Sequence, residues 1–183
     1  RVITFRIAHM VQRGIAPENI LAVTFTNKAA REMLERVNSL LPRDPRRQTR
    51  DPDKKPSRPT VSTFHSLCVR ILRQHIELLG YKKNFVIYDE SEQLGAIKKI
   101  LAHICAKGEP ADPRAILTVL SKVKNGGAQA EALLKDPNTS VLAEIVRKKY
   151  ESALKACNAV DFDDLILLTL RLLPLHRTLR IGV

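Results

Sequence analysis

Hydrophobic positions near the start of the chain follow first a helical and then an extended pattern. Between residues 4 and 13 the apolar side chains recur every three or four positions, and this pattern ends at Gly14. The next run, ILAVTF at 20–25, is apolar on both faces, as in a strand that helices cover on both sides. Helical spacing returns from residue 28 to about 41, with Asn27 as the predicted N-cap. This stretch therefore predicts a helix, a strand and a second helix.

A second strand and helix follow in the same order further along the chain. The short run TVST favours a strand, and an amphipathic helical pattern follows it and stops at Gly80. Each of the two strands leads into its helix through a Thr-Phe pair (Thr24-Phe25 and Thr63-Phe64). The alternation of strands and helices predicts an α/β fold. Two strands are too few for a doubly wound sheet, so we expect its other strands to lie outside this chain.

Beyond residue 84 the predicted elements are helices without strands between them. A short extended piece precedes the first helix, whose N-cap is either Asp89 or Ser91. A last apolar helix begins in VDFDDL at 160–165 and continues through Leu173. The block between these two points is typical of an all-helical insertion into an α/β domain. Its four helical segments lie within 89–107, 112–127, 128–136 and 140–159.

Charge is the feature of the composition that changes this picture most. Lys and Arg number 31 against 19 Asp and Glu in the 183 residues, which gives a formal charge of +12. Such a balance favours a polyanion as partner, although a basic surface without a specific partner remains the alternative. Seven of the basic residues lie in 42–59 together with five Pro, a composition that predicts a solvated loop.

Cysteine usage and hydropathy bear on where the protein acts. Cys68, Cys105 and Cys157 are odd in number and widely spaced, with no C-x-x-C pair among them. We therefore expect reduced thiols in a cytoplasmic protein. The sequence has no run of 18 apolar residues and no secretory pattern at its start, so we expect no membrane partner.

The two Thr-Phe junctions are the candidate binding site. Ligands of open α/β sheets bind at the carboxyl ends of strands, where the next helix begins and backbone N–H groups point outward. Thr24, Thr26 and Asn27 can hydrogen-bond phosphates or sugars, and Phe25 offers a face on which a base can stack. Together with the similar second junction, Ser62-Thr63-Phe64-His65, they predict a path for single-stranded nucleic acid. The alternative is that the polar residues cap helices and the Phe side chains pack beside them.

Three longer motifs resemble those of a single protein family. VTFTNKAAREMLERV resembles motif Ia, and STFHSLCVRILR resembles motif Ib, of the UvrD/Rep/PcrA helicases. These are superfamily 1 ATP-dependent DNA helicases that move 3′ to 5′. ACNAVDFDDLILL resembles the segment that leads back into their first RecA-like domain, and it is most similar to the Rep members. The resemblance covers essentially the whole chain, in the family's order and spacing.

The resemblance implies a domain organisation and a set of DNA contacts. In this family a RecA-like domain, 1A, is interrupted by a helical subdomain, 1B, so residues 1–83 and 158–183 are expected in 1A and residues 84–157 in 1B. Expected partners are single-stranded DNA, junctions of single- and double-stranded DNA, and the remaining helicase domains. Motif Ia implies single-stranded DNA contacts, and motif Ib implies DNA-backbone contacts. The residues concerned are Thr24, Phe25, Thr26 and Asn27 in motif Ia, and Thr63, Phe64 and His65 in motif Ib.

The family's ATP chemistry needs two motifs that this sequence does not contain. No glycine belongs to a P-loop, G-x-x-x-x-G-K-[ST], and the D-E-x-x of the family is expected beyond Val183, where this sequence ends. RVITFRIAHMV resembles the sequence that directly follows a family P-loop, so Arg1 is expected beside that loop and is the one cofactor-binding candidate. We therefore expect an N-terminal fragment of a helicase that uses ATP and Mg²⁺. By itself the fragment is expected to bind neither well, to hydrolyse no ATP and to unwind no DNA.

Several alternatives stay open from the residues alone. The chain could be a stand-alone nucleic-acid-binding or interaction module without ATPase activity. His65 could be a general base, but no nucleophile or orienting partner is identifiable, which favours a phosphate or structural hydrogen bond. Asp161, Asp163 and Asp164 could be metal ligands, although a helix cap with charges near the positive end of the helix dipole is the simpler interpretation. The basic stretch IVRKKYESALK faces either duplex DNA or solvent.

Overall fold

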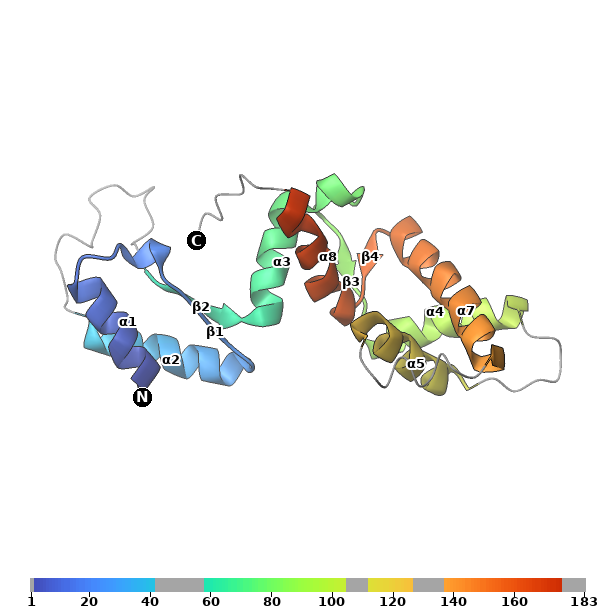
Figure 1. Ribbon diagram of the computed structural model, residues 1–183, viewed down its shortest axis with the longest axis horizontal. Coiled ribbons are helices and arrows are strands. Elements are labelled where there is room, and N and C mark those ends of the chain that lie inside the picture. Colours follow the sequence, from blue (N-terminus) through green and yellow to red (C-terminus); the bar gives the residue numbers. More distant parts are fainter. Residues whose placement is uncertain (1, 42–57, 105–111, 127–136, 176–183) are drawn as a thin grey trace. The chain divides into compact units, whose positions relative to one another are not determined.

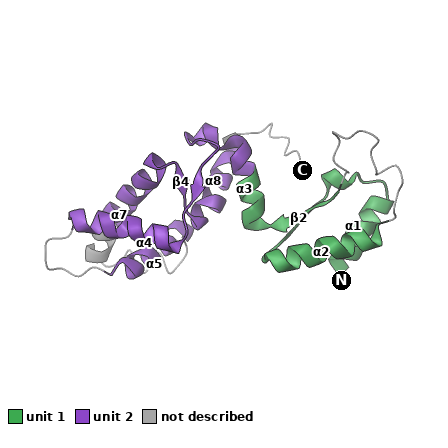
Figure 2. Cartoon of the chain, turned by 180° about the vertical axis from the view of Figure 1, so that it is seen from behind, with its two compact units in different colours: residues 1–70, 178–183 green, residues 71–177 purple. Residues whose placement is uncertain are grey.

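A computed structural model describes residues 2–41, 58–104, 112–126 and 137–175 (Figure 1). These residues form two compact units, which are coloured separately in Figure 2. Among the described residues, the first unit ends at Arg70 and the second begins at Ile71. The described part of the chain is a helix-rich α/β protein whose few strands pair in parallel, as the sequence predicted.

Two short parallel strands are the centre of the first unit. β1 (Leu21–Thr24) pairs with β2 (Thr60–Thr63), and Thr24 lies opposite Thr63 in the register. α1 (Val2–Gln12) and a 3-10 turn (Pro17–Asn19) precede β1, and α2 (Asn27–Leu40) follows it. This order of helix, strand and helix confirms the sequence prediction. The core consists of Ile7, Ala8, Val11, Ile20, Ala22, Val37 and Leu41.

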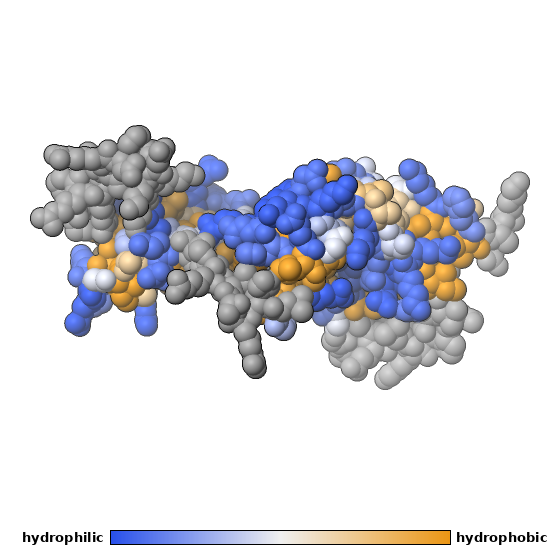
Figure 3. Space-filling view, turned by 90° about the horizontal axis from the view of Figure 1, so that it is seen from above, coloured by the Kyte–Doolittle hydropathy of each residue, from blue (hydrophilic) through white to orange (hydrophobic). Residues whose placement is uncertain are grey.

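Among the described residues, β1 is not covered on both faces. Ala22 is buried in the core, whereas Leu21 is exposed. The prediction of helices on both sides of this strand is therefore wrong for this part of the chain. Figure 3 shows hydrophobic areas (orange) among the hydrophilic side chains (blue) of one face of the molecule.

Two helix ends differ from the sequence prediction. The N-cap of α2 is Thr26 rather than Asn27, because Thr26 Oγ1 accepts a hydrogen bond from the N–H of Ala29 at 3.1 Å. Thr26 is extended, which brings its hydroxyl over the open N–H groups of the first turn, whereas Asn27 is already helical. α3 (Phe64–His75) ends before Gly80, because the chain tightens into a 3-10 turn at Ile76–Leu79. Gly80 then adopts a φ of 77°, which favours glycine.

The second unit is mainly helical. α4 (Glu90–Ile104), α5 (Pro113–Asn125) and α7 (Pro137–Ala156) pack against one another, and α8 (Phe162–Leu175) follows them. The two-residue strands β3 (Val86–Ile87) and β4 (Ala159–Val160) flank these three helices in the sequence and pair in parallel. One buried hydrophobic cluster of the unit consists of Ile97, Leu101, Leu120, Val146, Tyr150, Leu154 and Ala159.

The described helices of this unit confirm the helical block predicted from the sequence, but β4 was not predicted. The predicted helix at 128–136 and residues 42–57 of the predicted loop lie outside the described residues. The assignment of 84–157 to a 1B subdomain stays a prediction. In the part of the chain that the structure describes, every helix is too short or too polar to cross a membrane.

Asp89 is the residue that caps α4. Its Oδ1 accepts a hydrogen bond from the N–H of Glu92 at 2.9 Å, and Glu92 Oε2 accepts one from the N–H of Asp89 at 2.8 Å. This reciprocal arrangement is a capping box, which satisfies two backbone donors that the helix itself leaves open. Of the two candidates from the sequence, the structure therefore selects Asp89 over Ser91.

Asp89→Ala is expected to lower the free energy of unfolding by about 1 kcal/mol, because one of the two donors loses its partner. Ser91→Ala removes the other candidate and should change the free energy by less than about 0.5 kcal/mol. Urea denaturation followed by circular dichroism measures both values. Equal losses in the two variants would contradict the assignment of Asp89 as the cap.

Candidate nucleic-acid interface

The parallel register brings the two Thr-Phe junctions together. Thr24 and Thr63 end their strands as register partners, so the residues that follow them emerge at the same edge. Phe25 and Phe64 are those residues, and their ring centroids are 5.8 Å apart with an interplanar angle of 46°. Two segments that lie about 40 residues apart in the sequence thus form one aromatic pair at the carboxyl ends of the strands.

The two rings are exposed although they are large and apolar. Phe25 is 89% exposed and Phe64 is 43% exposed. A side chain that packs beside a helix cap would be covered by its own helix, which is not the case for Phe25. The alternative of packed Phe side chains therefore does not describe Phe25. An exposed aromatic pair instead offers a surface on which other planar groups can stack.

Two hydroxyl groups of the junctions, those of Thr26 and Thr63, cap helices. Thr26 accepts from the N–H of Ala29, as described, and Thr63 Oγ1 accepts from the N–H of Ser66 at 3.2 Å. Thr63 also donates its proton to Ser66 Oγ at 2.8 Å and is buried. Thr63 therefore has no hydroxyl proton left for a ligand. Thr26 is exposed, and its hydroxyl proton has no acceptor among the described residues.

The other predicted site residues are distributed unequally around this pair. Asn27 is exposed at the first turn of α2, Thr24 is half-buried, and His65 is half-buried in the first turn of α3. Ser62 Oγ is buried and has no hydrogen-bond partner among the described residues. Arg1, the candidate for the cofactor, lies outside the described residues. The structure thus brings both junctions to one edge but exposes chiefly Phe25, Thr26, Asn27 and Phe64.

Comparison with known proteins assigns the family. Residues 1–181 match the family model described as the UvrD/REP helicase N-terminal domain. The chain belongs to this family. The resemblance carried by the three sequence motifs is therefore confirmed.

Relatives of this UvrD/REP helicase domain share its sequence over most of its length. PcrA of Leuconostoc citreum, an ATP-dependent DNA helicase, is 42% identical over 175 residues, which are 94% of this chain and 22% of the relative. PcrA of Bacillus subtilis is also 42% identical, over 176 residues and the same shares of the two chains. The chain thus spans about a fifth of the length of these curated relatives. Both are PcrA proteins, so the particular similarity to Rep stays a prediction.

Of the three aspartates at the start of α8 in this UvrD/REP helicase domain, Asp161 and Asp164 form a cap. Asp161 Oδ1 accepts from the N–H of Asp164 at 2.9 Å, and Asp164 Oδ2 accepts from the N–H of Asp161 at 3.3 Å. Asp163 accepts hydrogen bonds from Ser121 at 2.7 Å and from Asn125 at 3.1 Å. The cap interpretation is therefore confirmed for Asp161 and Asp164, whereas Asp163 binds side chains of α5. The structure contains no group of three metal-ligating side chains among its described residues.

Lys124 at the end of α5 completes this cluster. Its Nζ lies 2.6 Å from Asp161 and 2.8 Å from Asp164, and the side chains of Lys124 and Asp161 are each only 5% exposed. Burial lowers the pKa of Lys124, but the two carboxylates outweigh this effect and raise it above its usual value. Burial raises the pKa of Asp164, and Lys124 opposes that shift. A buried ion pair thus joins α5 to the start of α8.

Sequence reasoning missed Lys124, although a signal for it exists. Lys124 follows Leu117 and Leu120 at the spacing of one helix face, and Leu120 is buried. A lysine on the apolar face of an amphipathic helix needs a buried partner, which indicates an ion pair. The partner itself, 37 residues further along the chain, is not readable from the sequence.

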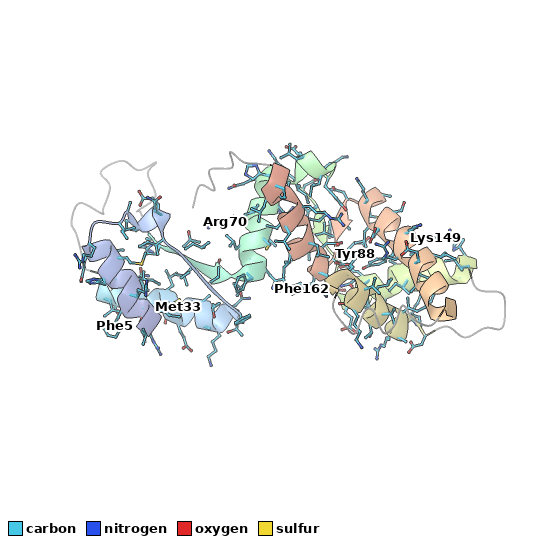
Figure 4. The ribbon with its side chains drawn as sticks, viewed as in Figure 1. Phe5, Met33, Arg70, Tyr88, Lys149 and Phe162 are labelled. Carbon is cyan, nitrogen blue, oxygen red and sulfur yellow. The ribbon has the colours of Figure 1, made fainter. Side chains whose placement is uncertain are left out.

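The basic stretch of α7 is partly neutralised within its own helix. Arg147 binds Glu144 at 2.9 Å and Glu151 at 3.2 Å, and Lys148 lies 3.5 Å from Glu144. Lys149 is exposed on the same helix (Figure 4). The question whether this helix faces duplex DNA or solvent stays open, but two of the four cations in the stretch, Arg147 and Lys148, already have carboxylate partners.

Proposed function

We propose that this chain supplies part of the single-stranded DNA path of an ATP-dependent DNA helicase. The observation that carries the proposal is the exposed pair Phe25 and Phe64 at the carboxyl ends of two parallel strands, with ring centroids 5.8 Å apart. Exposed aromatic rings bind single strands because every base has a face that can stack. Family membership supports DNA as the ligand, since the PcrA relatives are named DNA helicases.

The polar groups around the rings suit the backbone of the same strand. The first N–H groups of α2 have no intrahelical acceptor, and the positive end of the helix dipole favours a phosphate there. The hydroxyl of Thr26 and the amide of Asn27 are exposed beside them. In this proposal Thr24, Thr26, Asn27 and His65 contact sugars or phosphates. Thr63, whose hydroxyl is bonded inside the protein, positions Phe64 instead.

The finer features of the helicase also belong to this proposal. They are 3′ to 5′ movement, action at junctions of single- and double-stranded DNA, and an arrangement in which 84–157 form subdomain 1B within RecA-like domain 1A. The sequence contains no P-loop, so its residues do not fit the phosphates of ATP. Its D-E-x-x string at 89–92 does not supply a free Mg²⁺ site, because the carboxylates of Asp89 and Glu92 form the capping box of α4. We propose that other parts of the helicase hold both, and that this chain alone does not hydrolyse ATP.

Phe25→Ala is expected to weaken binding of a labelled single-stranded oligonucleotide by about 5- to 150-fold, which corresponds to about 1–3 kcal/mol per stacked base. The ring is 89% exposed, so its loss should leave the stability unchanged. The affinity is measured by fluorescence anisotropy at one salt concentration. Phe5→Ala is the matched control, because Phe5 is also exposed in the first unit but lies on α1 (Figure 4).

Equal affinities of the Phe25→Ala and Phe5→Ala proteins would contradict the stacking site. If single strand and duplex then also bind alike, the charge of +12 alone explains binding. That result would favour the alternative of a general nucleic-acid-binding module without a helicase path.

A further inference from the structure

A cleft in the second unit combines basic side chains with a half-buried tyrosine. It has a volume of about 590 Å³ and lies between α7, α8, the end of α5 and the segment around Tyr81. This volume is within the usual range of small-molecule sites, about 300–1,000 Å³. The cleft is separate from the Phe25–Phe64 pair, which belongs to the first unit. Its charged lining consists of Lys124, Arg147, Lys148, Lys155, Arg171, Glu151 and Asp164.

Most of these charges are already paired. Asp164 is held by Lys124 at 2.8 Å, and Glu151 by Arg147 at 3.2 Å. Lys148 lies 3.5 Å from Glu144, which is outside the cleft lining. Both carboxylates of the cleft therefore have their own cations, so they do not neutralise the cations that remain.

Lys155 and Arg171 are those remaining cations. Neither has a carboxylate within 4.0 Å among the residues that the structure describes. Both side chains are exposed, Lys155 on α7 and Arg171 on α8, so they approach the cleft from two helices. Two unpaired cations beside a concave surface attract an anion.

Tyr81 adds a hydrogen-bond donor to the same cleft. Lys155 Nζ lies 5.5 Å from the centroid of its ring. Burial and the charge of Asp164 raise the pKa of Tyr81, while Lys124 and Arg171 oppose the shift. The phenol therefore keeps its proton at neutral pH. Its hydroxyl has no hydrogen-bond partner among the described residues, so it can donate to a ligand.

We propose that this cleft binds a phosphate group of a DNA strand, with Lys155 and Arg171 as its charges and Tyr81 as its donor. Phosphate oxygens accept from all three types of donor, and Lys and Arg dominate phosphate contacts in protein–DNA interfaces. The identity of the strand as DNA rests on the proposed function. The cleft itself rests on different residues, in a different unit of the chain.

The test compares the salt dependence of binding for two double variants. Lys155→Ala with Arg171→Ala removes the unpaired cations of the cleft. Lys98→Ala with Arg114→Ala removes the same charge from exposed positions of α4 and α5 in the same unit, outside the cleft lining. All four side chains are exposed, so thermal melting should show folded proteins in both cases.

Loss of two phosphate contacts lowers the salt slope for a single strand by about 1.4, since each contact contributes about 0.7. The affinity lost between roughly 50 and 200 mM salt should therefore be about sevenfold smaller for the cleft variant than for the wild type. The control variant should keep the slope of the wild type. Tyr81→Phe, which removes only the hydroxyl, should weaken binding without changing the slope.

Identical slopes in the two double variants would overturn the proposal. Inorganic phosphate is the probe for a free anion: if it raises the melting temperature of the wild type but not of the cleft variant, while the two double variants keep identical salt slopes for the oligonucleotide, the cleft holds free phosphate and the assignment to DNA fails. The salt slopes of the double variants are independent of the Phe25→Ala result. If the stacking site is correct, Phe25→Ala lowers the affinity for the oligonucleotide but leaves the salt slope unchanged. A smaller salt slope in the cleft variant, together with an unchanged affinity in Phe25→Ala, would support the cleft and reject the stacking site.

Discussion

Replacing Lys124 with Met is expected to lower the free energy of unfolding by about 3–5 kcal/mol. The substitution keeps the length and most of the apolar stem of the side chain but removes its charge. Asp161 and Asp164, which lie 2.6 Å and 2.8 Å from Nζ, then become two neighbouring carboxylates without a cation. Asp161 is only 5% exposed, so water cannot replace the lost partner.

Urea denaturation of the variant and the wild type measures this loss. Lys122→Met is the matched control, because Lys122 is an exposed residue of the same helix and its removal should change the stability by less than about 0.5 kcal/mol. A further variant combines Lys124→Met with Asp161→Asn and Asp164→Asn. It should regain much of the stability, since no charge is then left unpaired. A Lys124→Met protein as stable as the control would show that the ion pair is not needed.

The loss should also depend on pH in a defined direction. Burial already raises the pKa of Asp164 above its usual 3.8, and removal of Lys124 takes away the charge that opposes this shift. A carboxyl whose pKa is higher in the folded than in the unfolded state favours folding at low pH, and this contribution is lost as the pH rises through the folded pKa. The deficit of Lys124→Met should therefore be largest at neutral pH and shrink as the pH falls toward about 4.

The contrast between the two ends of this ion pair shows what the sequence could predict. The cap at Asp161 and Asp164 is a local pattern, in which polar residues three positions apart open an apolar helix, and it was predicted correctly. Lys124 lies 37 residues earlier, and its approach depends on how α5 packs against α8. Hydrophobic periodicity indicates which face of a helix is buried, but it does not indicate which residues of other elements pack against that face.

In the candidate nucleic-acid interface, too, the local patterns could be predicted from the sequence but the long-range contact could not. Each Thr-Phe junction was found from its own sequence, because a strand that runs into a helix is a local pattern. The pairing of Phe25 with Phe64 depends on the register of β1 and β2, which local patterns do not fix when the strands are only four residues long. The cap was placed one residue late, at Asn27, because both Thr26 and Asn27 are good capping residues and only the backbone conformation separates them.

Phe85→Ala is the second substitution with a large expected effect, a loss of about 3–5 kcal/mol in the free energy of unfolding. Phe85 is only 1% exposed, so the variant leaves a cavity. The guanidinium of Arg73 lies 3.9 Å from the centroid of the ring and also donates to the carbonyl of Lys83 at 2.6 Å. The ring thus fixes the chain directly before β3.

Amide hydrogen exchange can locate the effect of this substitution. The N–H of Val86 donates to the carbonyl of Asn158 at 3.0 Å, and the N–H of Tyr88 to that of Val160 at 2.9 Å, so these two amides report on the pairing of β3 with β4. Both should exchange faster in Phe85→Ala, because the cavity loosens the segment that leads into the pair. Phe5→Ala removes the same atoms from an exposed position and should leave both rates unchanged. Slow exchange of Val86 and Tyr88 in Phe85→Ala would mean that the strand pair, together with the hydrogen bonds of Asn158 to Lys82 and Asn84, holds this connection without the ring.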